Sequence, residues 1–312
     1  NFSGEYFFMW QVSPTVIFGR NQIIDAEVNL EYCRANAIDT CRRKSGGGCV
    51  YADMNNIMFS HITTCNSVAT TFTAFTSRVA SMLQLMGVDA HTTGRNDILI
   101  GDRKVSGYAF YHIPLAGADG AMSRAIVHGT MLHDADLESM TAALTPSAVK
   151  LKAKGVESVR SHVTTIREHS PVSLADFKAF AASTLCNGTM TLTDADVKAI
   201  ERIAEPYYDP AWIYGRRLDA VAAGVRSRTP RRVEGVGEFV VDMTVSDTPV
   251  PVVQTLDLKG DFFLTADLDT LLARLVGVEL QREALSEALA GIDAAMTIAG
   301  LTNDRLVDLL LN

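Results

Sequence analysis

Residues 42–51 combine the residue types that bind an anion: Arg-Arg-Lys-Ser-Gly-Gly-Gly-Cys-Val-Tyr. Glycine has no Cβ, so its backbone can lie close to a ligand and can adopt positive φ angles. Successive N–H groups of such a turn can point at one anion. The arginines add positive charge and Ser45 adds a hydroxyl group. Because a surface hairpin can show the same pattern, this segment alone predicts either an anion-binding loop or a glycine-rich hairpin with charged flanks.

A second candidate segment lies at residues 94–107, Gly-Arg-Asn-Asp-Ile-Leu-Ile-Gly-Asp-Arg-Lys-Val-Ser-Gly. The pattern predicts a short strand, a tight turn and a second strand, with Lys104 just after the turn. Taken by itself, a lysine at such a position is usually a solvated surface residue. Lys104 becomes a candidate catalytic group only when the two segments are considered together.

Together the two segments resemble the lipoate–protein ligase family. Its members carry an Arg-Arg-x-Ser/Thr-Gly-Gly-Gly loop, then an Asn-Asp pair, then Gly/Asp-x-Lys-Ile/Val-Ser-Gly. Two further stretches fit the pattern: His128-Gly129-Thr130-Met131-Leu132 and Lys154-Gly155-Val156-Glu157-Ser158-Val159-Arg160-Ser161. All four motifs occur in the family's order, and the resemblance runs from about Phe7 to the C-terminus. The chain is therefore similar to the two-domain ligases of the biotin and lipoate ligase superfamily.

The resemblance implies an α+β fold: a mixed-sheet catalytic domain like that of biotin and lipoate ligases, plus a small α+β accessory domain at the C-terminus. We place the catalytic domain at residues 1–215 and the accessory domain at residues 226–312, because residues 207–228 look like a link, with few periodic signals and several helix breakers. Family members usually begin with a further strand and helix bearing an Asn-Leu-Ala-x-Glu-Glu-like pattern. That pattern does not occur in this sequence, so we expect the first element to be either missing from it or replaced.

The reaction implied by the resemblance joins lipoate to a lysine of a lipoyl-domain protein, either an E2 subunit of a 2-oxoacid dehydrogenase or the glycine-cleavage H protein. A carboxylate does not condense with an amine in neutral water, so ATP must first activate it, here as lipoyl-AMP. Lys104 matches the family lysine that bridges phosphate and acyl carbonyl. A fixed ammonium there would stabilise charge building on phosphorus and on the leaving pyrophosphate. Asp97 could hold Mg²⁺ on the phosphates.

The other binding residues are also implied by the family motifs. Arg43 matches the arginine that contacts the ligand, and Asn56 matches an amide at the adenine end. The full set of expected substrate- and nucleotide-binding residues is Arg43, Ser45, Gly46, Gly47, Gly48, Cys49, Val50, Tyr51, Asn56, Asn96, Asp97, Lys104, Ser106, Gly107, His128 and Gly129.

Some of these residues have a purely structural alternative. His128 could be a satisfied histidine at a strand end, and Asp97 could cap a turn. We interpret Cys49 as a small hydrophobic residue and not as a nucleophile, because unpaired cysteines are often simply buried. We expect Arg42 to be only a solvated neighbour of Arg43.

The sequence departs from the family pattern in three places. After the glycines, family members often show His-Asp-x-Gly-Asn where this chain has Ala52-Asp53-Met54-Asn55-Asn56. Asparagine adopts the left-handed conformation more readily than other non-glycine residues, so Asn55 is tolerable there. After Lys104, Ser-Gly-Ser-Ala becomes Ser106-Gly107-Tyr108-Ala109, and Val-Thr-Asn-Leu becomes Val163-Thr164-Thr165-Ile166. We expect these changes to affect the nucleotide loop or the acyl preference.

Apolar periodicity predicts the elements that position these residues. Strands are expected at residues 6–10, 15–18, 40–43, 49–52, 56–62, 125–132, 238–245 and 252–258, and helices at 29–37, 69–86, 136–144, 174–185 and 193–205. A turn at residues 260–263 precedes three short helices. Residues 108–124, which contain two glycines and an aspartate near their middle, predict a mobile loop.

Composition limits the class of protein. The chain has 312 residues, 47% of them hydrophobic and 21% charged, which is ordinary for a globular protein with a sizeable core. Its net charge of −8 does not suggest a nucleic-acid partner. The sequence contains no run of about 18 apolar residues, so it predicts no membrane-spanning helix. The five cysteines show no metal-ligand spacing, and their odd number argues against a disulfide framework. We therefore expect a cytoplasmic protein.

Three other functions stay open on the sequence. An ATP-independent transferase that moves octanoyl or lipoyl groups between carrier proteins would share the fold but use a cysteine nucleophile. The intact Arg-Arg-x-Ser-Gly-Gly-Gly loop and the accessory domain favour the ligase. A non-catalytic lipoyl-binding protein would be favoured if the substituted positions prevented adenylation. A biotin ligase fits less well, because that family's Gly-Arg-Gly-Arg loop is absent from the sequence.

Overall fold

The computed structural model describes residues 4–65, 67–93, 96–114, 123–145, 162–215, 225–226 and 229–312. Two compact units make up the chain. The first comprises Asn1–Phe18, Ala26–Arg42 and Cys49–Gly215, and the second comprises Gly19–Asp25, Arg43–Gly48 and Arg216–Asn312. The second unit therefore includes two short segments from the N-terminal part of the chain, one of which is most of the glycine-rich motif. The sequence had led us to assign both segments to the catalytic domain.

A six-stranded sheet in the order β1-β5-β9-β8-β7-β6 forms the centre of the first unit. Its strands are β1 (Tyr6–Trp10), β5 (Asn56–Cys65), β9 (Ser123–Leu132), β8 (Arg103–Pro114), β7 (Asp97–Ile100) and β6 (Ala90–Thr92). All neighbouring strands in it are antiparallel. In a smaller sheet, β2 (Thr15–Phe18) is parallel to β3 (Asp39–Arg42) and antiparallel to β4 (Val50–Ala52). The unit thus has the mixed-sheet α+β architecture that the resemblance implied.

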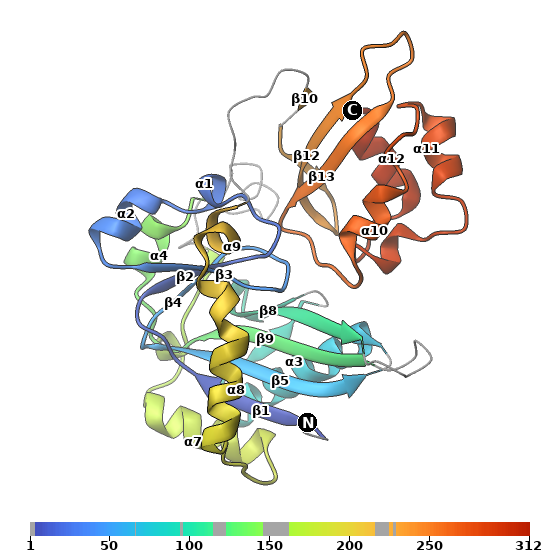
Figure 1. Cartoon of the computed structure of the whole chain (residues 1–312). Coiled ribbons are helices and arrows are strands. Elements are labelled where there is room, and N and C mark those ends of the chain that lie inside the picture. Colours follow the sequence, from blue (N-terminus) through green and yellow to red (C-terminus); the bar gives the residue numbers. More distant parts are fainter. Residues whose placement is uncertain are drawn as a thin grey trace. The chain divides into compact units, whose positions relative to one another are not determined.

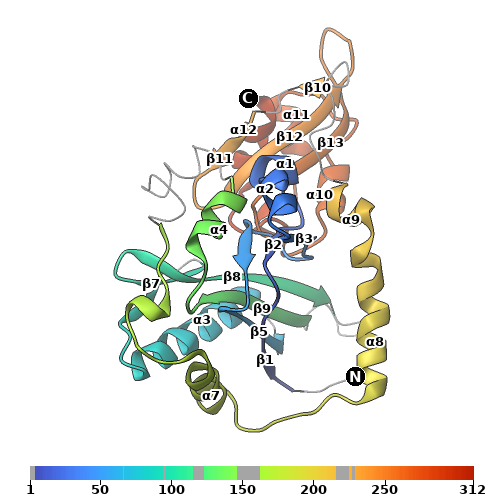
Figure 2. The ribbon, with the colours of Figure 1, turned by 90° about the vertical axis from the view of Figure 1, so that its left-hand side faces the viewer.

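Helix α3 (Val68–Leu85) covers one face of the six-stranded sheet (Figures 1 and 2). The Ser67 side chain caps its first turn by accepting from the Thr70 N–H, and Gly87, at φ +80°, follows its C-terminal end. The core beneath it comprises Phe72, Phe75, Val79, Met82 and Leu83 of α3, Ile57, Phe59, Val127 and Met131 of the sheet, and Phe177 of α7 (Leu174–Leu185). This core determines which sheet face is buried.

The remaining helices of this unit lie around the two sheets. They are α1 (Ile24–Glu27), which begins in the second unit, α2 (Leu30–Ala35), α4 (Leu137–Ala143), α8 (Asp194–Ala204) and α9 (Pro210–Tyr214), with short 3-10 turns at Ile166–Glu168 and Glu205–Tyr208. Figures 1 and 2 show α8 on the side of the six-stranded sheet opposite α3, and none of its residues is buried. Helix α3 thus contributes buried side chains to its face of the sheet, whereas α8 contributes none to the opposite face.

The expected mobile loop at residues 108–124 was wrong at both of its ends. Residues 108–114 belong to β8, and β9 already begins at Ser123; residues 115–122 lie outside the described part of the chain. The glycines near the middle of this segment suggested a loop, but Tyr108 and Ala109 are buried and pair with β9. Their apolar contacts and ladder hydrogen bonds extend the strand beyond the motif that ends at Gly107.

The expected link at residues 207–228 also contains structure. Tyr214 Oη lies 3.2 Å from Thr40 Oγ1, and Trp212 Nε1 donates a 2.9 Å hydrogen bond to the Arg42 carbonyl. Both contacts attach α9 to β3. The first unit therefore extends to Gly215.

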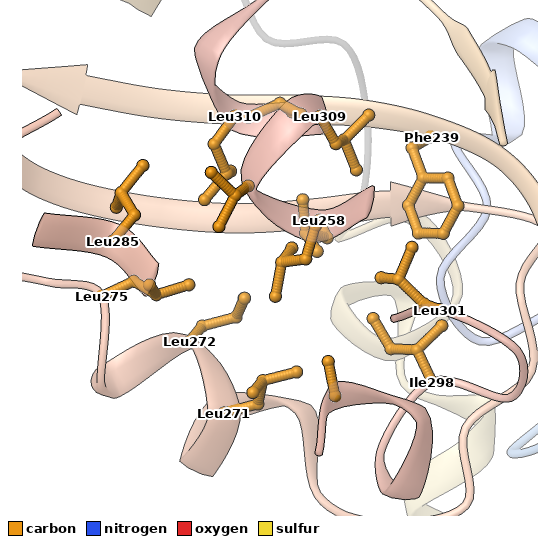
Figure 3. Close-up of a cluster of buried hydrophobic side chains, with 14 of the residues drawn as sticks. Phe239, Leu258, Leu271, Leu272, Leu275, Leu285, Ile298, Leu301, Leu309 and Leu310 are labelled. Carbon is orange, nitrogen blue, oxygen red and sulfur yellow. The ribbon is translucent and has the colours of Figure 1, made fainter. Parts of the chain in front are cut away.

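The C-terminal part of the second unit is a four-stranded antiparallel sheet with helices against it. Its strands are β10 (Val225–Arg226), β11 (Arg231–Val233), β12 (Gly237–Val245) and β13 (Val253–Gly260), and its helices are α10 (Leu268–Ala273), α11 (Arg282–Ala288) and α12 (Asn303–Leu311), with a 3-10 turn at Ala294–Met296. Figure 3 shows its leucine-rich core, in which Phe239 and Leu258 of the sheet meet Leu271, Leu285 and Leu309 of the helices. Among the described residues, no helix has the length and hydropathy needed to cross a membrane.

Candidate active site

The hairpin of β7 and β8 carries the candidate catalytic lysine. Gly101 lies in the turn between the two strands at φ +61°, a conformation that favours glycine. Lys104 Nζ lies 2.7 Å from Asp97 Oδ1, and the two side chains are 19% and 17% exposed. Such an ion pair is screened less than one on the open surface. The structure therefore brings together two of the residues that the motifs predicted.

Gly107 provides the space in which the lysine ammonium lies. It pairs directly with Asp97 in the β7–β8 ladder. A Cβ atom on Gly107 would lie 2.3 Å from Lys104 Nζ, 2.4 Å from Lys104 Cε and 3.3 Å from Asp97 Oδ1. These distances are far below van der Waals contact, so a larger residue at this position would displace the lysine side chain.

Strand register identifies the other residues on the same sheet face as Gly107. Directly paired residues of antiparallel strands have neighbouring side chains on one face. Ala109, two residues after Gly107, pairs with His128, and His128 pairs with Ser60 of β5. Ser60 Oγ accepts a 3.1 Å hydrogen bond from Trp10 Nε1 of β1. The half-buried His128 thus lies on the Lys104 side of the sheet, as its predicted role requires.

Three other predicted residues make contacts within the sheet. Ser106 is fully buried, and its hydroxyl donates to the Thr130 carbonyl. A Cβ atom on Gly129 would lie 2.5 Å from the Tyr108 ring, so Gly129 makes room for a core aromatic. Asn96 Nδ2 donates to the Tyr108 carbonyl at 3.3 Å, and the Tyr108 N–H donates to the Asn96 carbonyl at 2.7 Å. These contacts fix the backbone from which Lys104 projects.

The segment from Val163 onward braces the start of β8. The Thr164 N–H donates to the Lys104 carbonyl at 2.8 Å. Glu168 accepts from Arg103 Nη1 at 2.9 Å and from the Thr165 N–H at 3.2 Å. Although burial acts in the opposite direction, the hydrogen bond from Arg103 holds the pKa of Glu168 below its ordinary value. Thr165 stands where the family usually has asparagine, and together with Glu168 it forms a capping box at the start of the 3-10 turn.

Arg43 holds the glycine loop of the second unit from within. Its Nη2 donates to the carbonyl oxygens of Gly46 at 2.7 Å and of Gly48 at 2.8 Å, and its Nε donates to Ser45 Oγ at 3.0 Å. Ser45 itself is buried. The guanidinium offers several donors in a fixed geometry, which suits the clustered acceptors of a tight loop. Arg43 therefore orders the loop, and the direct ligand contact that the motif implied for it stays a prediction.

Glycine occupies the three positions of the loop for different structural reasons. A Cβ atom on Gly46 would lie 2.2 Å from the Phe262 carbonyl oxygen. Gly47 has φ +85°, its N–H donates to the Phe262 carbonyl at 3.2 Å, and a Cβ atom on it would lie 2.8 Å from the Phe263 ring. A Cβ atom on Gly48 would meet nothing within 4 Å among the described residues. Packing within the unit therefore requires glycine at positions 46 and 47. The packing of the described residues does not require glycine at position 48.

The residues after the glycines lie in the first unit. Cys49 and Val50 are half-buried, and Val50 and Tyr51 belong to β4. Tyr51 is 3% exposed, and burial raises its pKa to about 12. Asn56 is fully buried, with Nδ2 donating to the Tyr51 carbonyl at 3.3 Å. Tyr51 and Asn56 are thus part of a packed interior, and their contact with a nucleotide stays a prediction.

Arg42 is the residue that the sequence-based interpretation misjudged. We expected a solvated side chain, but Arg42 is only 4% exposed. Its Nε donates to the carbonyls of Trp212 and Ile213, each at 3.0 Å, and its guanidinium carbon lies 4.7 Å from the Phe18 ring centroid. The first of the two arginines therefore anchors α9. The cluster of aromatic residues at 207–214 was the available signal, because large aromatic side chains usually mark packing.

Two predicted motif portions, residues 94–95 and residues 154–161, lie outside the described part of the chain.

Comparison with known proteins agrees with the motifs. Residues 1–186 match the lipoyl protein ligase A/B catalytic domain, and residues 227–310 match the bacterial lipoate protein ligase C-terminus. Lipoate–protein ligase 1 of Staphylococcus aureus is 32% identical over 313 residues, which cover 98% of this chain and 90% of that protein. The chain belongs to the lipoyl protein ligase family.

Other lipoate ligases are also similar to this chain, over most or all of its length. The Bacillus subtilis lipoate-protein ligase LplJ is 29% identical, covering 98% of this chain and 91% of that protein. The structure of P. falciparum LipL1 in complex with lipoate has a TM-score of 0.73 at 18% identity, covering 99% of this chain and 86% of that chain. A bi-partite ligase from Thermoplasma acidophilum, solved in a study that included its E2 lipoyl domain, has a TM-score of 0.59 at 24% identity, covering 70% of this chain and 87% of that chain. The structural likeness shows the shared biotin/lipoate ligase fold.

Proposed function

We propose that the protein is an ATP-dependent lipoate–protein ligase. It converts lipoate and ATP to lipoyl-AMP and pyrophosphate, and then transfers the lipoyl group to a lysine of a lipoyl-domain protein. The observation that carries this proposal is the Lys104 ammonium, held by Asp97 over Gly107 in a chain whose two parts both match lipoate ligases. We place the reaction in the cytoplasm.

In the activation step, a carboxylate oxygen of lipoate attacks the α-phosphorus of ATP, and pyrophosphate leaves. Lys104 stabilises the negative charge that develops in this transition state, because its ammonium is already fixed before the reaction begins. We propose that the glycine loop binds ligand through its backbone at Gly48, where a Cβ atom would meet nothing within 4 Å among the described residues. Mg²⁺ accompanies the phosphates of ATP and is bound with the nucleotide as part of the substrate.

In the transfer step, the acceptor lysine attacks the acyl carbon of lipoyl-AMP, and AMP leaves. We propose lipoyl domains of E2 subunits as acceptors, supported by the study of the T. acidophilum ligase with its E2 lipoyl domain. The glycine-cleavage H protein presents a lysine in the same chemical setting and is the second acceptor that we propose.

An ATP-independent transferase is the main alternative, and the match of residues 227–310 to the lipoate protein ligase C-terminus favours the ligase. The two functions differ in what they consume. Purified full-length protein should lipoylate an apo lipoyl domain in the presence of lipoate and MgATP, detected by intact mass, and should form no product without ATP. Lys104→Ala should slow the reaction by about 10² or more, the scale for losing one preorganised charge stabiliser. Product formed without ATP from an octanoyl- or lipoyl-carrier would instead establish the transferase.

A further inference from the structure

We propose that Asp97 and Gly107 are positioning residues for Lys104, and that Asp97 is not a magnesium ligand. The inference rests on the proposed ligase function, because Lys104 must take part in activation for its position to matter. Asp97 Oδ1 holds the ammonium at 2.7 Å, and the absent side chain of Gly107 leaves the space that Lys104 Nζ and Cε occupy.

A β-bulge brings Lys104 to the same sheet face as Gly107. In a regular strand, residues three positions apart point to opposite faces. Ile98 pairs with Ser106, but the next residue, Leu99, pairs with Lys104, so Val105 is the extra residue of the bulge. Bulges re-aim side chains next to active sites. Because of this one extra residue, Lys104 lies over Gly107 and within reach of Asp97.

The geometry around Asp97 does not suit a metal ion. Among the described residues, no group of three His, Cys, Asp or Glu side chains is placed to hold a metal ion, so a magnesium ion on Asp97 would rely on that one carboxylate and the phosphates of the nucleotide. A magnesium ion bound to Asp97 would lie about 2.1 Å from a carboxylate oxygen, next to the ammonium that is 2.7 Å from the same carboxylate. Like charges at this separation repel each other strongly. We therefore assign the carboxylate to the lysine, with which it forms the ion pair described above.

Two substitutions move the ammonium without removing it. Gly107→Ala places a methyl group where the end of the flexible lysine side chain lies, so Lys104 shifts while the strand remains. Asp97→Asn keeps the shape of the side chain but removes its charge. A displacement of about 1 Å can cost a factor of 10² in rate. We expect each variant to lower kcat of lipoate-dependent ATP–pyrophosphate exchange by roughly 10- to 100-fold, with little change in the KM for lipoate.

The magnesium dependence and the double variants separate positioning from metal binding. The half-saturating Mg²⁺ concentration should stay at the wild-type value in both variants. Adding Asp97→Asn or Gly107→Ala to Lys104→Ala should cause no further loss, because residues that act as one unit are not additive. Gly188→Ala is the matched glycine control, since a Cβ atom there meets nothing within 4 Å; it should leave kcat unchanged.

Each outcome decides one of the two proposals. A folded wild-type protein without lipoate-dependent exchange refutes the ligase function itself. An active wild type in which Asp97→Asn raises the half-saturating Mg²⁺ concentration several-fold overturns the positioning role. A lower kcat in the Asp97→Asn and Lys104→Ala double variant than in Lys104→Ala alone also overturns the positioning role. This comparison does not depend on the folding of Gly107→Ala.

Discussion

Gly48 gives a direct test of whether the glycine loop binds a ligand through its backbone. Gly48→Val adds carbon atoms where the described residues leave open space, and Gly48 is not among the glycines with positive φ. The free energy of unfolding should therefore change by no more than about 0.5 kcal/mol, as for ordinary surface substitutions. Gly46→Ala is the contrast, because its Cβ atom would lie 2.2 Å from the Phe262 carbonyl oxygen. Overpacking of this kind costs about 1–3 kcal/mol.

Ligand affinity should change in Gly48→Val even though stability does not. If the ligand lies against the Gly48 backbone, the valine side chain overlaps it, at a cost of about 1–3 kcal/mol. That cost corresponds to roughly 5- to 150-fold weaker binding. Gly47 cannot make this distinction, because its φ of +85° and its contact with the Phe263 ring would disturb the loop in the free protein.

The assay pairs calorimetric titration of a hydrolysis-resistant lipoyl-AMP analogue with urea unfolding of the same variants. We expect wild-type stability with weakened binding for Gly48→Val, and reduced stability for Gly46→Ala. Wild-type affinity in a folded Gly48→Val protein would refute the backbone-contact hypothesis, and the loop would then be a hairpin that packs within the second unit.

Other regions of the molecule give further predictions. Arg42→Ala should lower the free energy of unfolding by about 1–3 kcal/mol, because buried carbonyls lose their donor; a change below about 0.5 kcal/mol in urea unfolding would restore the solvated interpretation. Burial lowers the pKa of His61, against a smaller opposing effect of Glu5. The unfolded chain thus binds a proton at His61 more readily than the folded protein does, and stability should fall as the pH drops below about 6.5. His61→Phe should flatten the dependence of the urea unfolding midpoint on pH, and an unchanged slope would contradict this. Hydrogen bonds from Ser139 lower the pKa of Asp136, so this helix cap acts fully above the ordinary aspartate pKa and is lost as the pH falls through the lowered value. Asp136→Ala should cost about 1 kcal/mol at neutral pH, and thermal melts that show an equal cost in strong acid would oppose this assignment.

Elements defined by local patterns were predictable from the sequence. Strands at residues 6–10 and 15–18 and the helix at residues 174–185 are confirmed, the helix with Ser173 as its N-cap. Thr193 likewise caps α8, together with Asp196. Side-chain caps and apolar periodicity depend on residues within a few positions of one another, so a single sequence contains the necessary information.

Contacts between distant residues were not predictable in this way. Arg42 is buried by α9, about 170 positions later in the chain. Gly46 packs against Phe262, and no local pattern links the glycine motif to that turn. The bulge that aligns Lys104 with Gly107 is equally invisible, because their odd spacing predicts opposite faces in a regular strand.

The motifs predicted the candidate site through resemblance, and the structure adds how it is built. Lys104 and Asp97 lie together as the motifs implied. Ser106 and Gly129 make contacts that support the sheet. Their predicted roles in binding substrate or nucleotide stay predictions, because a motif shows which residues occur together but not which of them face a ligand.

Lipoate-dependent exchange of labelled pyrophosphate into ATP tests the central claim most directly, because it reports formation of the acyl-adenylate alone. We expect the purified full-length protein to catalyse the exchange only when lipoate is present, and Lys104→Ala to lower the rate by about 10² or more. No exchange by the folded wild-type protein, or a wild-type rate in folded Lys104→Ala, would contradict the assignment of Lys104 as the charge stabiliser of an ATP-dependent lipoate ligase.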